Sequence, residues 1–190
     1  MGDNLPYVDL GTNRTATALT SGETHNCAIL DNGDLKCWGR NEEGSLGLGS
    51  MLWKGDEANE MADFLPAVSL GSGLAPAAVT LGQFFTCALL DDATTKCWGL
   101  GASGQLGTEG TASLGDGGGE MGDALPVASL GSGRTVLHLA AGENFSCAIL
   151  DNNRVKCWGL NTSGELGIGA TDARGDGPGE MGDGLPAVSL

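Results

Sequence analysis

Residues 25–39 read HNCAILDNGDLKCWG, in which two apolar, Cys-bearing segments flank Asp31-Asn32-Gly33. An Asn-Gly pair between two such segments is a strong signal for a β-hairpin. Cys27 and Cys37 are equally distant from Asn32 along the chain, so they face each other in this hairpin. Directly opposed residues of antiparallel strands bring their Cα atoms within disulfide reach. The segment therefore predicts a β-hairpin closed by a disulfide.

The same segment returns twice, at a period of sixty residues. Residues 85–99 read FTCALLDDATTKCWG, and residues 145–159 read FSCAILDNNRVKCWG. A second motif, Met-x-Asp-x-Leu-Pro, keeps this period and begins at Met1, Met61, Met121 and Met181. Fixed periods of this length are the signature of repeat architectures. We therefore expect a strand of a preceding blade at 1–10 and three repeats, at 11–70, 71–130 and 131–190, which form a segment of a longer array or a polymer subunit.

Each repeat contains four short apolar segments that are typical of strands. In the third repeat they are 136–140, 146–150, 155–159 and 185–190, and a long Gly-, Asp- and Glu-rich loop precedes the last one. Four short strands per repeat are typical of a β-propeller blade. The predicted fold class is all-β, with three four-stranded blades of sixty residues each plus an extra strand.

The six Cys residues predict three disulfides, Cys27–Cys37, Cys87–Cys97 and Cys147–Cys157. Closing a loop of this size stabilises a fold by about 2.7 kcal/mol in the chain-entropy model. The alternative is metal ligation, which requires about four ligands per ion, whereas each repeat has two Cys and no recurring His. Disulfides predict an oxidising compartment, so we expect the protein outside the cell or on its surface.

After each Trp-Gly pair comes a Gly-x-Leu-Gly turn, at 44–47, 104–107 and 164–167. Together with residues 25–39 and Asn41, these turns resemble the repeat of the regulator of chromosome condensation family. The resemblance implies a β-propeller of four-stranded blades, usually seven in a closed ring. The paired Cys residues and the Gly/Asp-rich loops are more similar to a secreted branch of the family than to its nuclear members.

The resemblance does not specify one function, because a shared fold supports many activities. Members of the family include a nucleotide-exchange factor on chromatin, enzyme inhibitors, scaffolds and a plant ultraviolet receptor that uses clustered Trp residues. Trp38, Trp98 and Trp158 stand one per repeat at the family's structural position. We interpret them as core residues rather than as a light sensor.

Composition excludes several classes of function. The chain has 190 residues, 34 of them Gly, and a formal net charge of −15. A protein that binds nucleic acid through its phosphates needs a basic face, so we expect no nucleic-acid partner. No apolar run approaches the roughly 20 residues of a membrane span. The chain has neither a P-loop nor a Gly-x-Ser-x-Gly motif, and we expect it not to be an enzyme.

One loop per repeat carries three carboxylates, which are candidate metal ligands. They are Asp56, Glu60 and Asp63, then Asp116, Glu120 and Asp123, and then Asp176, Glu180 and Asp183. Carboxylates on a Gly-rich backbone suit Ca²⁺. The simpler interpretation is that they cap turns by accepting hydrogen bonds from backbone N–H groups. We favour turn capping, so the expected cofactor is none, with Ca²⁺ as the alternative.

Two further features are candidate surface sites. Met51-Leu52-Trp53 is an apolar tripeptide in a polar loop, which indicates either a protein contact or packing onto its own blade. Asn13, Asn144 and Asn161 begin Asn-x-Ser/Thr motifs and are candidate glycosylation sites. Asn161 follows the Trp-Gly strand, and we expect it to be the most exposed of the three.

Three blades cannot close a ring alone, so either further repeats in cis or self-association must complete the assembly. The first hypothesis is a secreted, non-enzymatic structural protein, a repeat scaffold that builds a fibre or a surface layer. The alternative is an extracellular propeller that binds a soluble protein or glycan partner, as an inhibitor or a lectin-like module does. The uniform repeats favour the structural hypothesis, because a binding face would diverge from repeat to repeat.

Overall fold

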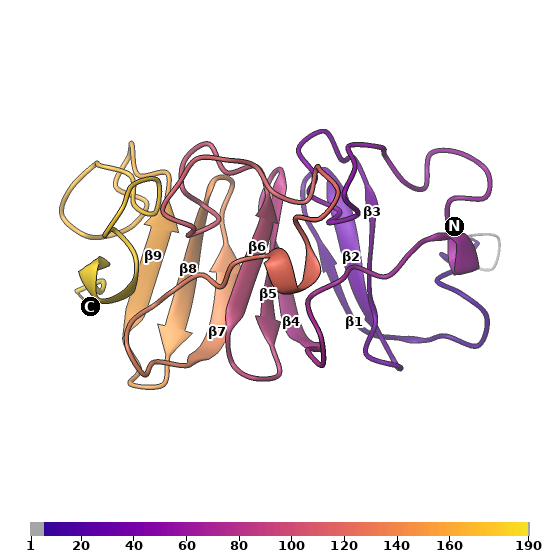
Figure 1. Ribbon diagram of the computed structural model, residues 1–190, viewed down its shortest axis with the longest axis horizontal. Helices are drawn as coiled ribbons and strands as arrows, with labels where there is room; N and C mark the ends of the chain where they lie inside the picture. Colours follow the sequence, from indigo (N-terminus) through magenta and orange to yellow (C-terminus); the bar gives the residue numbers. More distant parts are fainter. Residues whose placement is uncertain (1–5, 190) are drawn as a thin grey trace.

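Three small antiparallel β-sheets follow one another along the molecule, one from each repeat (Figure 1). The computed structural model describes residues 6–189. The first sheet consists of β1 (Ala16–Ser21), β2 (His25–Leu30) and β3 (Leu35–Gly39), the second of β4 (Pro76–Leu81), β5 (Phe85–Leu90) and β6 (Thr95–Gly99), and the third of β7 (Val136–Ala141), β8 (Phe145–Leu150) and β9 (Val155–Gly159). Single turns of 3-10 helix, η2 (Ala62–Phe64), η3 (Gly122–Ala124) and η4 (Gly182–Gly184), interrupt the long loops. The described part of the chain is therefore all-β, as predicted.

The central hairpin of each sheet has the predicted register. Cys27 pairs with Cys37 across β2 and β3, and the Cys residues of β5–β6 and β8–β9 pair in the same way. All three disulfides are formed, with Cα–Cα distances of 4.1, 4.1 and 4.0 Å. At the first turn Gly33 has a φ of 85°, a conformation that Gly adopts without steric cost. Ala93 and Asn153 take the same left-handed conformation in the other two turns.

The predicted fourth strand is reduced to one short contact with the third strand in each repeat, which in the second and third repeats is an isolated β-bridge, Lys96–Val127 and Lys156–Ala187. The N–H groups of Val68, Ala128 and Val188 donate to the carbonyls of Leu35, Thr95 and Val155, at 2.8, 2.9 and 2.9 Å. The pairing goes no further for two reasons. The segment contains a Pro, which lacks an N–H. In addition, the carbonyls of Ser69 and Ser129 accept hydrogen bonds from the N–H groups of Gly122 and Gly182 in the next repeat. Each sheet thus has three strands, not four.

The predicted extra strand at 1–10 is also absent where it can be described. Residues 6–10 form no strand, and the remainder of the segment lies outside the described residues. The carbonyl of Asp9 instead accepts from Ala62 N–H at 3.0 Å. This short segment therefore contacts the loop at the end of the first repeat.

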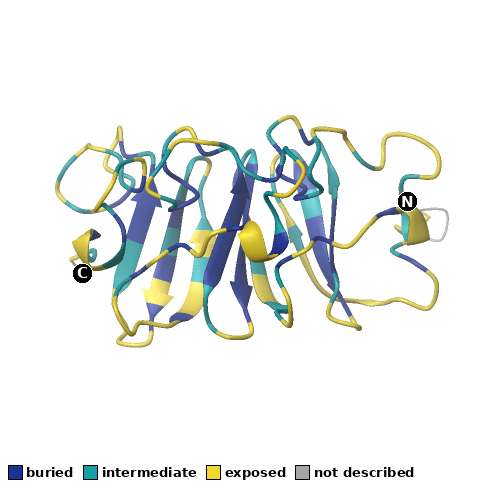
Figure 2. Ribbon diagram, in the orientation of Figure 1, coloured by how far each residue is buried: buried dark blue, intermediate teal, exposed yellow. Residues whose placement is uncertain are grey.

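The hydrophobic core lies between neighbouring repeats. One cluster joins Leu35 and Leu46 of the first repeat to Leu90 and Trp98 of the second. A second cluster joins the second repeat to the third, with Trp158 at its centre. Strands β5 and β6 of the middle sheet are buried along their whole length, whereas the outer sheets are partly exposed (Figure 2). Each repeat therefore needs a neighbour to bury its apolar surface.

Candidate functional site

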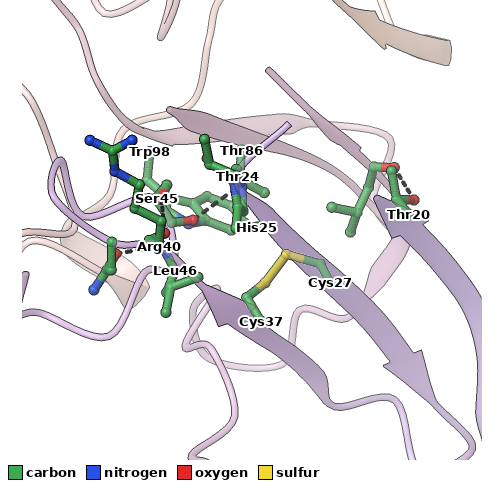
Figure 3. The surroundings of a disulfide bond; sticks show 12 residues. Thr20, Thr24, His25, Cys27, Cys37, Arg40, Ser45, Leu46, Thr86 and Trp98 are labelled. Carbon is green, nitrogen blue, oxygen red and sulfur yellow. Dashed lines mark hydrogen bonds between the residues drawn. A yellow bond between two sulfur atoms is a disulfide. The ribbon is translucent and has the colours of Figure 1, made fainter. Parts of the chain in front are cut away.

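A Trp side chain links each repeat to the one before it. The indole Nε1 of Trp98 donates to the carbonyl of Ser45 at 3.0 Å, and that of Trp158 donates to the carbonyl of Gln105 at 3.0 Å. The hydroxyl of Thr86 donates to the same Ser45 carbonyl at 2.8 Å (Figure 3). Both indoles are fully buried. The Gly-x-Leu-Gly turn of one repeat thus receives the Trp of the next, and these two Trp residues are core residues.

His25 adds a polar contact to the first of these junctions. Its Nε2 lies 2.8 Å from Thr86 Oγ1, and the ring is buried (Figure 3). Burial lowers the pKa of His25 to about 4, so the ring is neutral near pH 7. The Thr86 hydroxyl donates to the Ser45 carbonyl, so its oxygen is an acceptor for a proton on Nε2 of His25.

The Gly that begins each turn has no room for a side chain at the two internal junctions. A Cβ on Gly44 would lie 2.4 Å from the backbone N of Asp116, and one on Gly104 would lie 2.4 Å from that of Asp176. The two backbones approach this closely because a Gly stands there. At Gly164 of the third repeat, no described atom lies within 4 Å of such a Cβ.

The described residues therefore end in two unlike faces. The Trp face, at the first repeat, is defined by Trp38 and the Gly55-Asp56 loop, and here the Trp side chain is only half-buried. The Gly face, at the third repeat, is the turn at 164–167. Each face carries the same kinds of residue that form the two internal junctions. Within residues 6–189, no atom lies within 4 Å of a Cβ built on Gly164 of the Gly face.

The Glu residues of the acidic loops close those loops. Glu60 Oε2 accepts from the N–H groups of Gly55 (3.0 Å) and Glu57 (3.2 Å), and Glu60 Oε1 pairs with Lys54 at 2.9 Å. The hydrogen bond from Lys54 is the largest cause of a Glu60 pKa of about 2. Glu120 and Glu180 accept the corresponding backbone bonds in their own loops. These carboxylates act as turn caps.

The first Asp of each set stays beside its Glu. Burial, followed by the bond to Glu120, raises the pKa of Asp116, and burial with the bond to Glu180 does the same for Asp176. In the first repeat, Asp56 contributes to the lowered pKa of Glu60. The first two carboxylates of each predicted set therefore lie next to each other.

The third carboxylate of each set lies elsewhere. Asp63, Asp123 and Asp183 accept from the backbone N–H and hydroxyl groups of Thr12, Ser72 and Ser132, at the start of the same repeat. In the described part of the chain, no three His, Cys, Asp or Glu side chains converge as a metal site requires. The predicted grouping is therefore wrong, because two separate sets of N–H groups hold the carboxylates apart. Ca²⁺ binding itself stays a prediction.

The tripeptide Met51-Leu52-Trp53 lies on the surface. Its side chains are 57%, 67% and 44% exposed, respectively. The Arg40 guanidinium lies 5.9 Å from the centre of the Trp53 ring, close enough for a cation–π contact. Together with Asp56, Glu57 and Glu60, the tripeptide lines an open pocket of 370 Å³. The result is an apolar patch with an acidic rim.

Asn161 is buried, so the prediction that it is the most exposed sequon is wrong. Its Nδ2 donates to the carbonyls of Ala170 (2.8 Å) and Asp172 (2.9 Å), which closes the loop that follows the Trp-Gly strand. Asn144 is half-buried, whereas Asn13 is exposed. Of the three candidates, Asn13 is the one that a modifying enzyme reaches without unfolding the chain.

Sequence reasoning misses a Lys that binds the 3-10 turn near the end of its own repeat and, in the first two repeats, also the last residue before that repeat. Lys36 Nζ donates to the carbonyls of Leu10 and Ala62, at 2.8 and 2.7 Å, and Lys96 Nζ donates to those of Leu70 and Gly122, at 2.9 and 2.8 Å. Lys156 Nζ donates to the carbonyl of Gly182 at 2.7 Å. The signal is a Lys that recurs before every Cys-Trp-Gly, but only the fold shows which carbonyls it binds.

The motif that builds these junctions matches a described protein family. Residues 16–45 and 136–165 match the model of the regulator of chromosome condensation (RCC1) repeat. The first and third repeats of this chain thus match the RCC1 repeat. It is 33% identical over 153 residues, 80% of its length, to the RCC1 domain-containing protein RUG3, mitochondrial, of Arabidopsis thaliana, and covers 32% of that protein.

Two further RCC1-type comparisons agree. The ultraviolet-B receptor UVR8 of Arabidopsis thaliana is 30% identical over 84% of the chain, which covers 33% of the receptor. The crystal structure of Prp20p from Saccharomyces cerevisiae superposes with a TM-score of 0.64 over 92% of the chain and 38% of Prp20p, at 17% identity. The chain thus spans about a third of the length of the curated relatives that it matches. Its fold is that of RCC1 propeller repeats.

Proposed function

We propose that this RCC1-repeat chain is a non-enzymatic structural scaffold, in which the Gly face of one copy binds the Trp face of a second copy. The observation that carries the proposal is the open turn at Gly164. The equivalent Gly44 and Gly104 each abut a Gly-Asp loop of the next repeat, and Gly164 has the same positive φ with nothing against it.

The chemistry of the two faces supports this contact. The Trp face offers the indole of Trp38 and the Gly55-Asp56 loop. The Gly face offers the carbonyl of Glu165, at the position where Ser45 and Gln105 accept an indole N–H. Docking would remove the exposed part of the half-buried Trp38 indole from water. Head-to-tail contacts of this kind produce rings when they close and filaments when they do not.

An extracellular location is part of the proposal. Three disulfides support it, because such bonds persist in oxidising compartments. Within residues 6–189, no helix has the length and apolar character that crossing a membrane requires. The net charge of −15 opposes self-association, so we expect assembly to strengthen as salt screens this repulsion.

Sedimentation velocity over a range of concentrations, with electron microscopy under non-reducing conditions, tests the scaffold proposal. Gly164→Ala places a Cβ where the loop of a second copy would dock. Gly133→Ala is the matched control, because Gly133 has a φ of 66° and no atom within 4 Å of the added Cβ. We expect the parent chain and Gly133→Ala to assemble and Gly164→Ala to stay monomeric. A parent chain that stays monomeric, or a Gly164→Ala variant that assembles equally well, would overturn the proposal.

A second candidate function is the binding of a soluble protein partner through Met51-Leu52-Trp53. The exposure of this tripeptide favours it, and a solved structure of similar fold, Prp20p, is described with its binding properties to Gsp1p and histones. Trp53→Ser tests this candidate, since Ser113 stands at the same place in the second repeat. If Trp53→Ser abolishes assembly and Gly164→Ala does not, the tripeptide and not the Gly face makes the contact.

A further inference from the structure

Three of the nine Lys and Arg residues of this acidic chain line one cavity in the third repeat. They are Arg134, Arg154 and Lys156, and the cavity, of 360 Å³, lies beside the β8–β9 hairpin. The cavity is therefore a local concentration of positive charge on a protein whose formal net charge is −15.

This set of cations occurs in one repeat of the three. At the place of Arg154 the first repeat has Asp34 and the second has Thr94. At the place of Arg134 the second repeat has Leu74. The repeats diverge at this cavity, as a binding site requires and a purely structural repeat does not.

Lys156 donates fewer hydrogen bonds to the protein than Lys36 and Lys96, which occupy its place in the other repeats. Lys36 and Lys96 each donate to two carbonyls and are buried. Lys156 donates to the Gly182 carbonyl and is only half-buried. An ammonium group has three donors, so Lys156 keeps donors for a ligand. Burial, together with the nearby charge of Arg154, lowers the pKa of Lys156, while Asp183 acts in the opposite direction.

The carboxylates around the cavity do not neutralise all of its positive charge. Asp183 lines it but already accepts from Ser132 N–H at 3.0 Å and from the Ser132 hydroxyl at 2.6 Å. Arg134 pairs with Asp151 at 3.2 Å. Among residues 6–189, Arg154 has no ion-pair partner. An anion that enters would therefore meet at least one unpaired guanidinium and one ammonium.

The rest of the lining contains an apolar part. It consists of Pro186 and Ala187, with the buried Leu150 and Leu185, and the polar Ser132 and Asn152 complete the wall. Pockets of roughly 300–1,000 Å³ hold small organic ligands, with a few polar groups that set their orientation. A cavity of 360 Å³ has room for more than one tetrahedral oxyanion. The ligand that fits both walls carries an oxyanion on a small apolar group.

We propose that this cavity binds a phosphate or sulfate monoester, with its oxyanion held by Arg154, Lys156 and Arg134 and its organic group against Pro186 and Ala187. The guanidinium of Arg154 and the ammonium of Lys156 donate charge-assisted hydrogen bonds to the oxyanion. This inference is independent of the scaffold proposal, because the cavity lies within one chain and not between two.

The test is a titration of the 190-residue chain with phenyl phosphate and with inorganic phosphate, at constant ionic strength and at protein concentrations where the chain is monomeric. Calorimetry gives the affinity, and backbone amide shifts locate the site. Arg154→Thr introduces the residue of the second repeat. Arg14→Thr is the matched control, because Arg14 has its own Asp31 ion pair and lies in the first repeat.

We expect saturable binding of phenyl phosphate that Arg154→Thr weakens by about tenfold, as the loss of a charged hydrogen bond predicts. Arg14→Thr should leave the affinity unchanged, and the amide shifts should centre on Ser132 and Lys156. Equal weakening by both Arg variants, or the absence of saturable binding, would overturn the site. Equal affinity for inorganic phosphate and phenyl phosphate would overturn the role of the apolar wall.

Discussion

The indole Nε1 of Trp98 lies 3.0 Å from the carbonyl oxygen of Ser45, and this hydrogen bond joins two separate β-sheets. We expect Trp98→Leu to lower the free energy of unfolding by about 3 kcal/mol, because it leaves a cavity and removes a buried donor. Trp38→Leu is the control. Its ring is half-buried, so the loss should be about 1 kcal/mol. Urea denaturation followed by circular dichroism measures both, and equal losses would contradict the assigned role of the junction.

The Gly residues of the turns provide a second comparison. Gly104 and Gly164 have φ angles of 77° and 84°, so Ala is strained at both, by about 1–2 kcal/mol. Only at Gly104 does the added Cβ also meet a backbone N, at 2.4 Å. In dilute monomer, Gly104→Ala should therefore destabilise the chain by at least about 2 kcal/mol more than Gly164→Ala. Similar melting temperatures for the two variants would show that the repeats do not pack this closely.

His25 makes stability depend on pH. Its pKa is about 4 in the folded chain and about 6.5 when unfolded, so the unfolded state binds more protons between these values. The contribution of His25 is therefore complete above pH 6.5 and is lost as the pH falls toward 4. Between pH 6.5 and 4.5 this loss is about 2 kcal/mol. His25→Phe should remove it, since Phe85 and Phe145 occupy this place in the other repeats. Denaturation curves at both pH values measure the difference, and an unchanged pH dependence in the variant would assign it to other groups.

The disulfides should be formed in the native protein. We expect no alkylation by iodoacetamide before reduction and six modified Cys residues after it, by intact-mass measurement. Replacing both Cys87 and Cys97 by Ala should cost about 2.7 kcal/mol, the loop-closure value for a ten-residue separation. Chemical denaturation with and without reductant measures this cost. A variant as stable as the parent chain would show that this disulfide contributes nothing to the fold.

Calcium should leave the melting temperature unchanged. The carboxylates of Glu60, Glu120 and Glu180 already accept backbone N–H groups, and Asp63 lies at a different place in the repeat. A ligand that binds only the folded state raises its stability, so a titration with millimolar CaCl₂, against NaCl of equal ionic strength, detects a site. A saturable rise in melting temperature would restore the metal hypothesis.

Features set by neighbouring residues are predictable from the sequence here. The hairpin around Asn32 and the pairing of Cys27 with Cys37 depend on a turn of a few residues and on strand geometry, and both are confirmed. The sixty-residue period can be recognised directly in the amino-acid sequence. The errors concern contacts with other segments. Asn161 binds the carbonyls of Ala170 and Asp172 across its own loop, although its position after a strand predicts exposure.

The sequence alone therefore determined the all-β class, the sixty-residue period and the three disulfides, because each follows from local spacing. Only the tertiary structure decided that the fourth strand is lost, that Asp63 binds Thr12 at the far end of its repeat, and that Trp98 belongs to the junction with Ser45. These contacts join residues about fifty positions apart, and chain connectivity places no constraint on such pairs until packing brings them together. The same packing leaves Gly164 open and gathers Arg134, Arg154 and Lys156 around one cavity.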